Sequence, residues 1–375
     1  MKVATIVGTR PEVIKLSRVI AELDACCKHV LIHTGQNYDY ALNQVFFDQL
    51  AIRKPDHFLE VAGENLGQTI GNVIARSYSV LMAEAPDAVL LLGDTNSCLS
   101  VIAAKRLKIP VFHMEAGNRC FDERVPEEIN RRMIDHASDI NLTYTEHARR
   151  YLLAEGLRPE TVIKTGSPMR EVLDFYRSGI ESSDVVDRLD LKQRHYLLVS
   201  THREENVDDP ENLRNLLDSL RALHEKYRMP VIVSTHPRTR MRLDEIGVGD
   251  DDAGVKFIEA LGFLDYVKLE LSALCVLSDS GTITEEASIL GFPAVTLRQA
   301  HERPEGMDEG TLIMSGLKRE RVIEAVETMV RQHEGAQRAM RMVQDYEANN
   351  VSKKVARLII SYTDYVNRVV WRKSV

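Results

Sequence analysis

Short apolar segments alternate with amphipathic segments along this chain, and this alternation constrains the fold more than any other feature. The segment 88–92 reads AVLLL, has no polar residue and ends in the turn sequence Gly-Asp-Thr-Asn. A strand without alternating polar residues is typical of a parallel sheet that is covered on both faces. Segments with apolar residues at helical spacing follow such strands repeatedly. The sequence therefore predicts an α/β protein built from strand–helix–strand units.

The same pattern recurs in both halves of the chain. We predict strands at 2–7, 29–33, 88–92, 111–114 and 140–144, and again at 196–200, 230–234 and 273–277. A chain of 375 residues fits two domains, because single hydrophobic cores stop growing at about 250–300 residues. We expect Rossmann-like domains at 1–168 and 169–351, with a polar linker at 178–194. A last helix, at about 352–371, is amphipathic enough to pack back across a domain surface.

Composition excludes several classes of protein. A hydrophobic content of 44% with 28% charged residues is ordinary for a soluble globular protein. The net charge of −8, without a basic tract, argues against a nucleic-acid partner. No apolar run approaches the roughly 18 residues that cross a bilayer, and the N-terminus does not resemble a signal peptide. The five cysteines lack metal-site spacing, so we expect reduced thiols and a cytoplasmic protein.

The first predicted strand runs into a turn and a helix that together could bind an anion. Residues 8–11 read GTRP, and proline fits the first turn of a helix because its missing N–H has no partner there. The free N–H groups of such a turn attract anions, and Arg10 and Lys15 strengthen this interpretation. A lysine that extends along the surface is the alternative for Lys15.

Carboxylates follow two later strands of the first half. Asp94 ends one strand and Glu115 the next, and ligands of open parallel sheets bind at this edge. Pro126 opens a helix that carries Glu127 and Arg131 in its first two turns. The alternatives are a helix N-cap for Asp94 and a favourable helix-dipole interaction for Glu127.

Two strands of the second half end in histidine followed closely by arginine. His202 and Arg203 follow one strand, and His236 and Arg238 follow another. A single histidine of this kind is commonly a buried, satisfied residue. Two at equivalent strand ends favour an anion-binding edge.

A third strand of the second half leads into small residues at a helix N-terminus. Ser280, Gly281 and Thr282 would offer backbone N–H groups to a pyrophosphate. Glu286, one turn later, could accept both hydroxyls of a ribose. Arg303 lies in a polar turn that we expect at the same edge.

Taken together, these motifs resemble the non-hydrolysing UDP-N-acetylglucosamine 2-epimerases over nearly the whole chain. The motifs are GTRPE (8–12) with Lys15, GDTN (93–96), HMEAG (113–117), PEEINR (126–131), HREEN (202–206), HP (236–237), SDSGTITEE (278–286) and ERPE (302–305). The resemblance implies a glycosyltransferase-B-like fold, in which two Rossmann-like domains with parallel sheets face across a cleft that holds UDP. It also implies a homodimer, a C-terminal helix that returns to the first domain, and no cofactor or metal.

One branch of this family fits better than the others. The runs GQNYDY (35–40), with a predicted helix after it through 42–46, and FHMEAGNRCFD (112–122) look like the branch that forms UDP-N-acetyl-L-fucosamine from its C2 epimer, a 2,6-dideoxy-L-talose sugar, for surface polysaccharides. The N-acetylglucosamine branch usually has Leu-Arg in place of Asn118-Arg119 and an allosteric Gln-His in place of Gln36-Asn37. These departures argue against allosteric activation. Interconversion of UDP-N-acetylglucosamine and UDP-N-acetylmannosamine is the alternative.

The resemblance also implies a role for each residue. It makes Asp94, Glu115 and Glu127 the acid/base candidates, without deciding which removes the C2 proton. Lys15 and His202 would stabilise or protonate the leaving diphosphate. The residues implied to bind substrate are Arg10, Arg131, His236, Tyr266, Ser280, Gly281, Thr282, Glu286 and Arg303. Tyr266 would stack on uracil, or else serve as a core tyrosine. Three other functions stay open, namely a glycosyltransferase of this fold, a hydrolysing epimerase and a non-catalytic UDP-sugar sensor.

Overall fold

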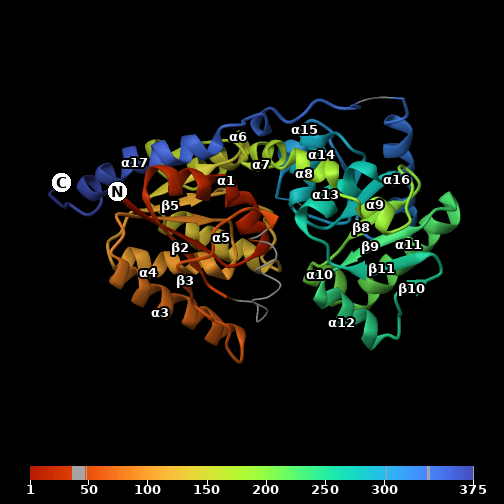
Figure 1. The fold of residues 1–375 in the computed structure, drawn as a ribbon, viewed down its shortest axis with the longest axis horizontal. Helices are drawn as coiled ribbons and strands as arrows, with labels where there is room; N and C mark the ends of the chain where they lie inside the picture. The colour runs from red at the N-terminus through yellow and green to blue at the C-terminus, as the bar shows by residue number, and fades with distance from the viewer. Residues whose placement is uncertain (36–46, 48, 301, 336–337, 375) are drawn as a thin grey trace. The chain divides into compact units, whose positions relative to one another are not determined.

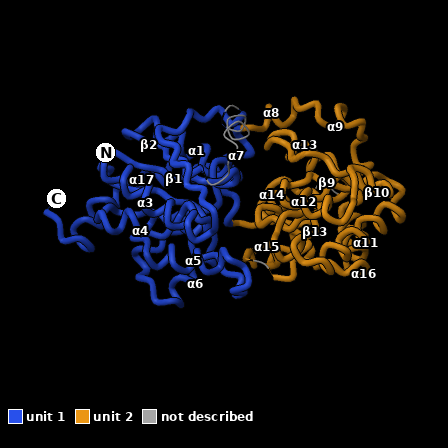
Figure 2. The backbone as a smooth tube through the Cα atoms, turned by 90° about the horizontal axis from the view of Figure 1, so that it is seen from below, with its two compact units in different colours: residues 1–175, 345–375 blue, residues 176–344 orange. Residues whose placement is uncertain are grey.

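The computed structural model describes residues 1–375 except 36–46, 48, 301, 336–337 and 375. The chain forms two compact units, one of residues 1–175 with 345–375 and one of residues 176–344 (Figure 2). Within the described residues, each unit contains one seven-stranded sheet, with helices on both faces (Figure 1). The predicted α/β fold with two mostly parallel sheets is confirmed.

The sheet of unit 1 reverses its direction of winding at β1. Its strand order is β3-β2-β1-β4-β5-β6-β7, and all neighbouring strands are parallel. The strands are β1 (Lys2–Val7), β2 (Lys28–His33), β3 (His57–Phe58), β4 (Ala88–Leu92), β5 (Val111–Met114), β6 (Ile140–Thr143) and β7 (Val162–Lys164). The chain winds outward on both sides of β1 and β4, so the carboxyl ends of these two strands form the switch point where such sheets bind ligands.

Helices cover both faces of this sheet. They are α1 (Arg10–Cys26), α3 (Leu66–Glu84), η1 (Asn96–Ser100), α4 (Val101–Arg106), α5 (Pro126–Ala137), α6 (Glu146–Ala154), η2 (Pro159–Thr161), α7 (Met169–Phe175), η3 (Gln344–Tyr346, at the boundary between the units) and α17 (Val351–Val369). Apolar residues of α3, α4 and α5 form a core cluster with one face of β1, β2, β4 and β5. On the other face, α1 packs against both α7 and α17 (Figure 1).

The unit boundaries lie seven residues away from the expected ones, at 175/176 and 344/345. At the first boundary, α7 belongs to unit 1, because the Arg18 guanidinium of α1 lies 3.5 Å from the centroid of the Phe175 ring. On the return, the Asp345 carboxylate accepts a hydrogen bond from the backbone N of Glu146 at 2.8 Å and pairs with Lys164 at 2.8 Å. These contacts attach both connecting segments to unit 1.

The sheet of unit 2 has the same kind of switch point, between β8 and β12. Its order is β10-β11-β9-β8-β12-β13-β14, and the pairs are parallel except β10 with β11. The strands are β8 (Leu197–Ser200), β9 (Val231–Thr235), β10 (Asp251–Asp252), β11 (Val255–Glu259), β12 (Cys275–Ser278), β13 (Ala294–Thr296) and β14 (Ile313–Met314). The acidic segment 250–252 therefore contains a short edge strand.

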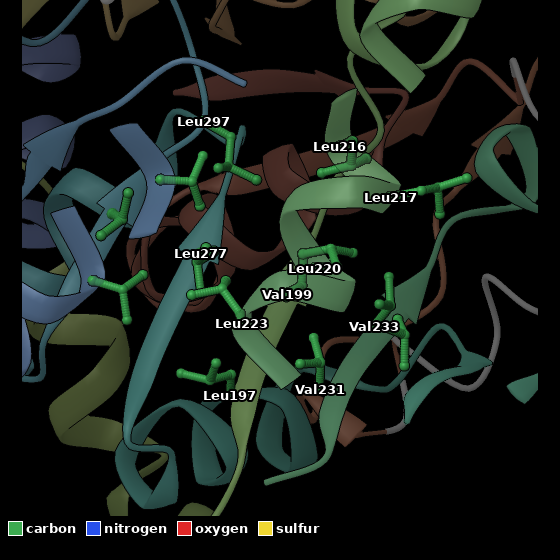
Figure 3. Packing of buried hydrophobic residues seen from close by; sticks show 14 of the residues in the cluster. Leu197, Val199, Leu216, Leu217, Leu220, Leu223, Val231, Val233, Leu277 and Leu297 are labelled. Atoms are coloured by element: carbon green, nitrogen blue, oxygen red, sulfur yellow. The ribbon is translucent and has the colours of Figure 1, made fainter. Parts of the chain in front are cut away.

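Strand residues of unit 2 alternate between two cores, as the period of a β-strand requires. Leu197, Val199 and Leu277 pack against leucines of α11 on one face, together with α16 (Figure 3). Leu198 and Val276 pack on the opposite face with residues of α13 and α14. The helices of this unit are α8 (Arg177–Ser182), α9 (Val185–Arg188), α10 (Glu204–Val207), α11 (Pro210–Tyr227), α12 (Pro237–Glu245), α13 (Phe263–Ser272), α14 (Thr282–Leu290), α15 (Pro304–Asp308) and α16 (Arg319–Gln332).

The prediction of a linker at 178–194 is wrong. This segment forms α8 and α9, and its apolar residues Ile180, Val185 and Leu191 are buried in unit 2. The Arg188 guanidinium pairs with Asp265 of α13 at 2.5 Å, which attaches the segment further. The helix predicted at 42–46, and the motif 35–40 beyond Gly35, lie outside the described residues. None of the described helices is long and apolar enough to span a membrane.

Candidate active site

The turn after β1 leads into α1, which presents Arg10 and Lys15. Thr9 is the N-cap of α1, and Arg10 is the first residue of the helix. Lys15 is only 4% exposed, and its Nζ lies 2.7 Å from Oε2 of Glu115. A lysine that extends along the surface is therefore excluded, because the ammonium group is buried in an ion pair at the end of the sheet.

Asp94 is paired with Arg131 in the loop after β4. Its Oδ2 lies 2.5 Å from Nη2 and 3.1 Å from Nε of Arg131, a side chain from α5 that is almost fully buried. The Asn130 amide donates to the backbone carbonyl of Asp94 at 3.0 Å. Thr95, and not Asp94, is the N-cap of η1. The N-cap alternative for Asp94 is therefore wrong, and its carboxylate instead holds a charged partner.

Glu115 stands at the end of the neighbouring strand in an unusual backbone conformation. Leu92 of β4 is in register with Met114 of β5, so the loops of Asp94 and Glu115 leave adjacent strand ends. Glu115 has φ +63°, a left-handed conformation that costs a non-glycine residue on the order of 1 kcal/mol. Glu127 lies half-buried in the first turn of α5. Unit 1 thus brings Lys15 to Glu115 and Arg131 to Asp94.

Glu12 is a buried carboxyl group of this edge that the sequence analysis did not select. Its Oε2 accepts hydrogen bonds from the backbone N–H groups of Gly8 and Thr9, and its Oε1 accepts from the hydroxyls of Thr95 and Ser97. Burial raises the pKa of Glu12 from 4.5 to about 7, although these hydrogen bonds oppose the rise. The spacing Thr9-x-x-Glu12 is a capping-box signature and could have identified the helix contacts, but not those to Thr95 and Ser97.

In unit 2, a buried carboxylate fixes the loop that carries His202. Asp279 accepts hydrogen bonds from the backbone N of His202 and of Arg203 at 3.1 Å and from the Asn206 amide at 3.0 Å. The Nδ1 atom of His202 also lies 3.3 Å from Asp279 Oδ1. Because Asp279 follows β12, its carboxylate joins the loops of the two central strands. Asp279 itself was not among the predicted site residues, although Ser280, Gly281 and Thr282 directly after it were.

His236, at the end of β9, lies beside His202 at the end of β8. The two imidazole centroids are 5.7 Å apart, and the rings are tilted by 41°. Nδ1 of His236 accepts a hydrogen bond from the backbone N of Arg238 at 3.2 Å, which leaves Nε2 as the donor of a neutral ring. Two imidazoles from neighbouring strand ends therefore share this edge of the sheet.

Ser280, Gly281 and Thr282 lie at the N-terminus of α14. The hydroxyls of Ser280 and Thr282 are 3.0 Å apart. A Cβ atom at Gly281 would come within 2.5 Å of Oε1 of Glu302, so a side chain there would displace the Glu302 carboxylate. A small pocket begins here, and it is lined by Ser280, Gly281, Thr284, Thr296, Arg298, Glu302, Arg303, Met307 and Leu312.

Acidic residues gather on the same side of unit 2. Arg303 is buried and its Nη2 lies 3.2 Å from Oε2 of Glu285. Glu286 is nearly buried beside the fully buried Glu270, and burial together with the charge of Glu286 raises the pKa of Glu270 well above its ordinary value. Tyr266 is half-buried against the core cluster of α13 and α14, and burial raises the pKa of its phenol.

No group of three or more histidine, cysteine, aspartate and glutamate side chains could hold a metal ion among the residues that the structure describes. The candidate residues therefore form two sets, one at the switch point of each sheet. The set of unit 1 combines carboxylates with buried cations, and the set of unit 2 combines a helix N-terminus with imidazoles. The structure places each set separately.

The family described as UDP-N-acetylglucosamine 2-epimerase matches residues 21–360. The chain belongs to this family. Within the UDP-N-acetylglucosamine 2-epimerase family, a structure from Rickettsia bellii is 57% identical, covers 100% of both chains and superposes with a TM-score of 0.92. A structure from Methanocaldococcus jannaschii, in complex with UDP-GlcNAc and UDP, is 34% identical over 96% of this chain and 100% of its own, with a TM-score of 0.89.

A relative with a different named substrate also matches. The UDP-2,3-diacetamido-2,3-dideoxy-D-glucuronate 2-epimerase of Pseudomonas aeruginosa is 34% identical over 334 residues, which cover 88% of this chain and 92% of that protein. The protein is therefore an isomerase of the UDP-N-acetylglucosamine 2-epimerase family, with the two-sheet fold of its structures. The names within the family differ in the sugar.

Proposed function

We propose that this protein inverts C2 of a UDP-2-acetamido sugar without hydrolysing it, by eliminating UDP and adding it back. The observation that carries the proposal is the pair of carboxylates, Asp94 and Glu115, each held by a buried cation at adjacent strand ends. Such a reaction needs bases near the sugar and positive or N–H groups near the diphosphate. The family membership, with solved relatives that contain UDP-GlcNAc, supports the same reaction class.

The C2 proton of such a sugar is not acidic, since no carbonyl group adjoins C2. Breaking the C1–O bond sends its electron pair to the departing UDP and builds positive charge at C1. A carboxylate then removes the C2 proton, and the electrons of the C–H bond form the C1–C2 double bond of a glycal. Adding a proton to the opposite face of C2, while a UDP oxygen attacks C1, gives the epimer.

We assign the proton transfers to unit 1. Asp94, Glu115 and Glu127 are the candidates, and the ion pairs with Arg131 and Lys15 support Asp94 and Glu115 as ionised bases. When substrate binds, the ammonium of Lys15 would also stabilise the negative charge on the departing UDP. Arg10, in the first turn of α1, would bind the same group.

We assign the nucleotide to unit 2. Ser280, Gly281 and Thr282 would bind a phosphate at the N-terminus of α14, since backbone N–H groups and the helix dipole favour an anion there. His202 would protonate or stabilise the leaving diphosphate together with His236. Glu286 would bind the ribose hydroxyls, and Tyr266 would stack on the uracil. Arg303 would lie near the diphosphate.

For the sugar itself we propose UDP-2-acetamido-2,6-dideoxy-L-talose, converted to UDP-N-acetyl-L-fucosamine for a surface polysaccharide. The support is the sequence at Asn118, whose amide lies 3.5 Å from Oε1 of Glu115. We expect a residue this close to Glu115 to contact the sugar. The Pseudomonas aeruginosa relative is named for a sugar other than N-acetylglucosamine. The named activity of other relatives makes UDP-N-acetylglucosamine the second candidate.

The deciding experiment is incubation of the enzyme with each UDP-sugar in deuterated water. We expect one deuterium at C2 of an intact UDP-sugar, detected by mass spectrometry and NMR, and faster exchange with the 6-deoxy-L-talose substrate than with UDP-N-acetylglucosamine. Free UDP with free sugar would indicate a hydrolase. Transfer of the sugar without deuterium would indicate a transferase, and binding without exchange a sensor.

We also propose that the enzyme is a homodimer that works in the cytoplasm. Neighbouring helices of unit 1 expose large apolar side chains, among them Tyr78 and Met82 of α3, Ile102 of α4 and Met133 of α5. The five cysteines are free thiols, which fits a reducing compartment. Light scattering coupled to gel filtration measures the mass, and the mass of one chain would contradict the dimer.

A further inference from the structure

Asp135 is a fully buried carboxylate of α5 that lies behind the acid/base candidates. Its Oδ1 lies 2.9 Å from Nδ1 of His113. Its Oδ2 accepts hydrogen bonds from the backbone N of Gly117 at 3.2 Å and from Nη1 of Arg119 at 2.7 Å. Arg119 in turn binds both oxygens of Glu155 at 2.7 Å. Three donors therefore satisfy one carboxylate that has no contact with water.

His113 is also fully buried, and its partners define its protonation state. Its second nitrogen, Nε2, lies 2.7 Å from the backbone carbonyl of Gly93, which can only accept. Since the Asp135 carboxylate also accepts, both ring nitrogens carry hydrogen and the ring is an imidazolium. Burial lowers the pKa of His113, but Asp135 and the Gly93 carbonyl outweigh it, so the net shift is upward. Burial likewise opposes ionisation of Asp135, yet His113 and Arg119 lower its pKa.

These contacts surround Glu115 along the chain. Asp135 holds the residue two positions before Glu115, His113, and the residue two positions after it, Gly117. Glu115 itself has the strained φ of +63°, which persists only where the surrounding contacts enforce it. Asp135 therefore clamps the strained turn from both sides.

The same pair extends to the loop of Asp94. The imidazolium of His113 holds the carbonyl of Gly93, directly before Asp94. The helix of Asp135 also carries Arg131, one turn earlier, which binds the Asp94 carboxylate. One buried ion pair thus connects the backbone of both carboxylate loops.

We propose that His113 and Asp135 are positioning residues that fix the loops of Asp94 and Glu115 in the orientation that proton transfer at C2 requires. This inference rests on the proposed epimerase function. It assigns neither residue to the substrate, since both are fully buried. It predicts that their substitution lowers turnover more than the loss of stability alone would explain. A misplacement of the catalytic groups by about 1 Å can cost about 10²-fold in rate.

Asp135→Asn tests the proposal, with Asp139→Asn as a matched control. An asparagine at 135 turns an NH₂ group toward either His113 or the Gly117 and Arg119 donors. Asp139 is a buried carboxylate one turn later that accepts from the backbone N of Val111 at 2.9 Å, at the opposite end of β5 from Glu115. We expect Asp135→Asn to lower kcat about 10²-fold and Asp139→Asn less than threefold, with similar losses of thermal stability. UDP affinity should change less than threefold in both.

His113→Asn separates the two contacts of the imidazolium. The asparagine amide can still donate to Asp135 but is too short to reach the Gly93 carbonyl. We expect about a tenfold loss of kcat at nearly unchanged KM, because only the Asp94 loop is released. This variant also decides the question if Asp135→Asn does not fold.

The outcomes separate this inference from the proposed function. Absence of C2 deuterium exchange in the unchanged enzyme refutes the epimerase function and this inference with it. If the unchanged enzyme exchanges deuterium, and Asp135→Asn and His113→Asn both have a kcat within twofold of that enzyme, only the positioning role is refuted. Equal losses of kcat in Asp135→Asn and Asp139→Asn would also refute it, because a general loss of stability would then explain both.

Discussion

At the scale of single residues, the proposed chemistry depends on how charge is paired before substrate arrives. Lys15 pairs with Glu115, and Arg131 pairs with both Asp94 and Glu128, so each candidate carboxylate faces a buried cation before substrate binds. Ion pairs of this kind are costly to break from one side, because the remaining charge stays buried.

Asp94→Asn and Glu115→Gln should each lower kcat by about 10²–10⁴-fold, the usual contribution of a general acid or base. UDP should still bind, because its proposed contacts lie mostly in unit 2. Rates of C2 deuterium exchange and calorimetric titration with UDP measure the two effects. Glu146→Gln, a change on the surface of α6, serves as the control. Near-normal turnover in both carboxylate variants would remove these residues from the mechanism.

Glu12→Gln should change how stability depends on pH. Burial raises the pKa of Glu12 to about 7, so the folded state holds its proton more tightly than the unfolded chain does. Stability therefore falls as the pH rises from about 4.5 to about 7, by up to about 3 kcal/mol. The glutamine stays neutral, so the free energy of unfolding of the variant should not fall across this pH range, whereas that of the unchanged protein should. Urea unfolding at pH 5 and pH 8 measures it, and parallel curves would contradict the prediction.

Sequence patterns selected candidate site residues, but not the buried residues that hold them in place. Asp94, Glu115 and Ser280 stand at strand ends or helix starts, where a ligand-binding role for polar side chains can be inferred from the local pattern. The roles of Asp135 and Asp279 depend on contacts between distant segments, such as Asp135 with His113. A buried aspartate in a helix or after a strand has no local signature that separates it from a surface one.

At the scale of elements, α17 completes unit 1 by packing against α1. Val355, Ile359 and Val366 face inward with almost no exposure, whereas Ile360 is 47% exposed. Beyond the helix, the ring of Trp371 lies 4.6 Å from the ammonium of Lys105 in α4. Since this is the single tryptophan of the chain, its fluorescence reports on the attachment of the C-terminal segment.

Ile359→Ala should lower the stability of unit 1 by about 2–5 kcal/mol, because it leaves a cavity between α17 and its neighbours. Ile360→Ala removes the same atoms from a largely exposed position and should cost less than about 1 kcal/mol. Tryptophan fluorescence during urea unfolding measures both. Equal losses in the two variants would show that the inward face of α17 does not contribute as described.

Most long elements follow from periodicity, and the short ones do not. The strand 88–92 has the predicted bounds, since its run of apolar residues is unambiguous. The pieces α8 and α9 span only six and four residues, too few to show a helical period. Their place is decided by the burial of Ile180 and Val185, which becomes visible only once unit 2 has formed.

At the scale of the whole molecule, each unit has its own sheet and core and one set of candidate residues. The division into two units could be predicted because the strand–helix pattern occurs twice in the sequence. The exact boundaries could not be predicted, because they depend on tertiary contacts such as those of Phe175 and Asp345. The division also separates nucleotide binding from proton transfer in the proposed mechanism.

Glu286→Ala should remove most of the stabilisation that UDP gives to the protein. A ligand at 100 times its Kd stabilises the folded state by about 2.7 kcal/mol, so loss of the ribose contact reduces the rise in Tm at a fixed UDP concentration. Asp94→Asn should keep the full rise. Glu324→Ala, an exposed change on α16, is the control within the same unit. A normal UDP-dependent rise in Glu286→Ala would contradict the ribose assignment.

The return of residues 345–375 to unit 1 has a consequence for synthesis on the ribosome. The whole of unit 2 is translated before the helix that covers α1 has been made. The side of α1 that packs against α17 therefore stays uncovered until residues 345–375 have been translated. A stop codon within residues 345–375 would release a chain with the whole of unit 2 but an incomplete unit 1, and chaperones and proteases would act on that unit first.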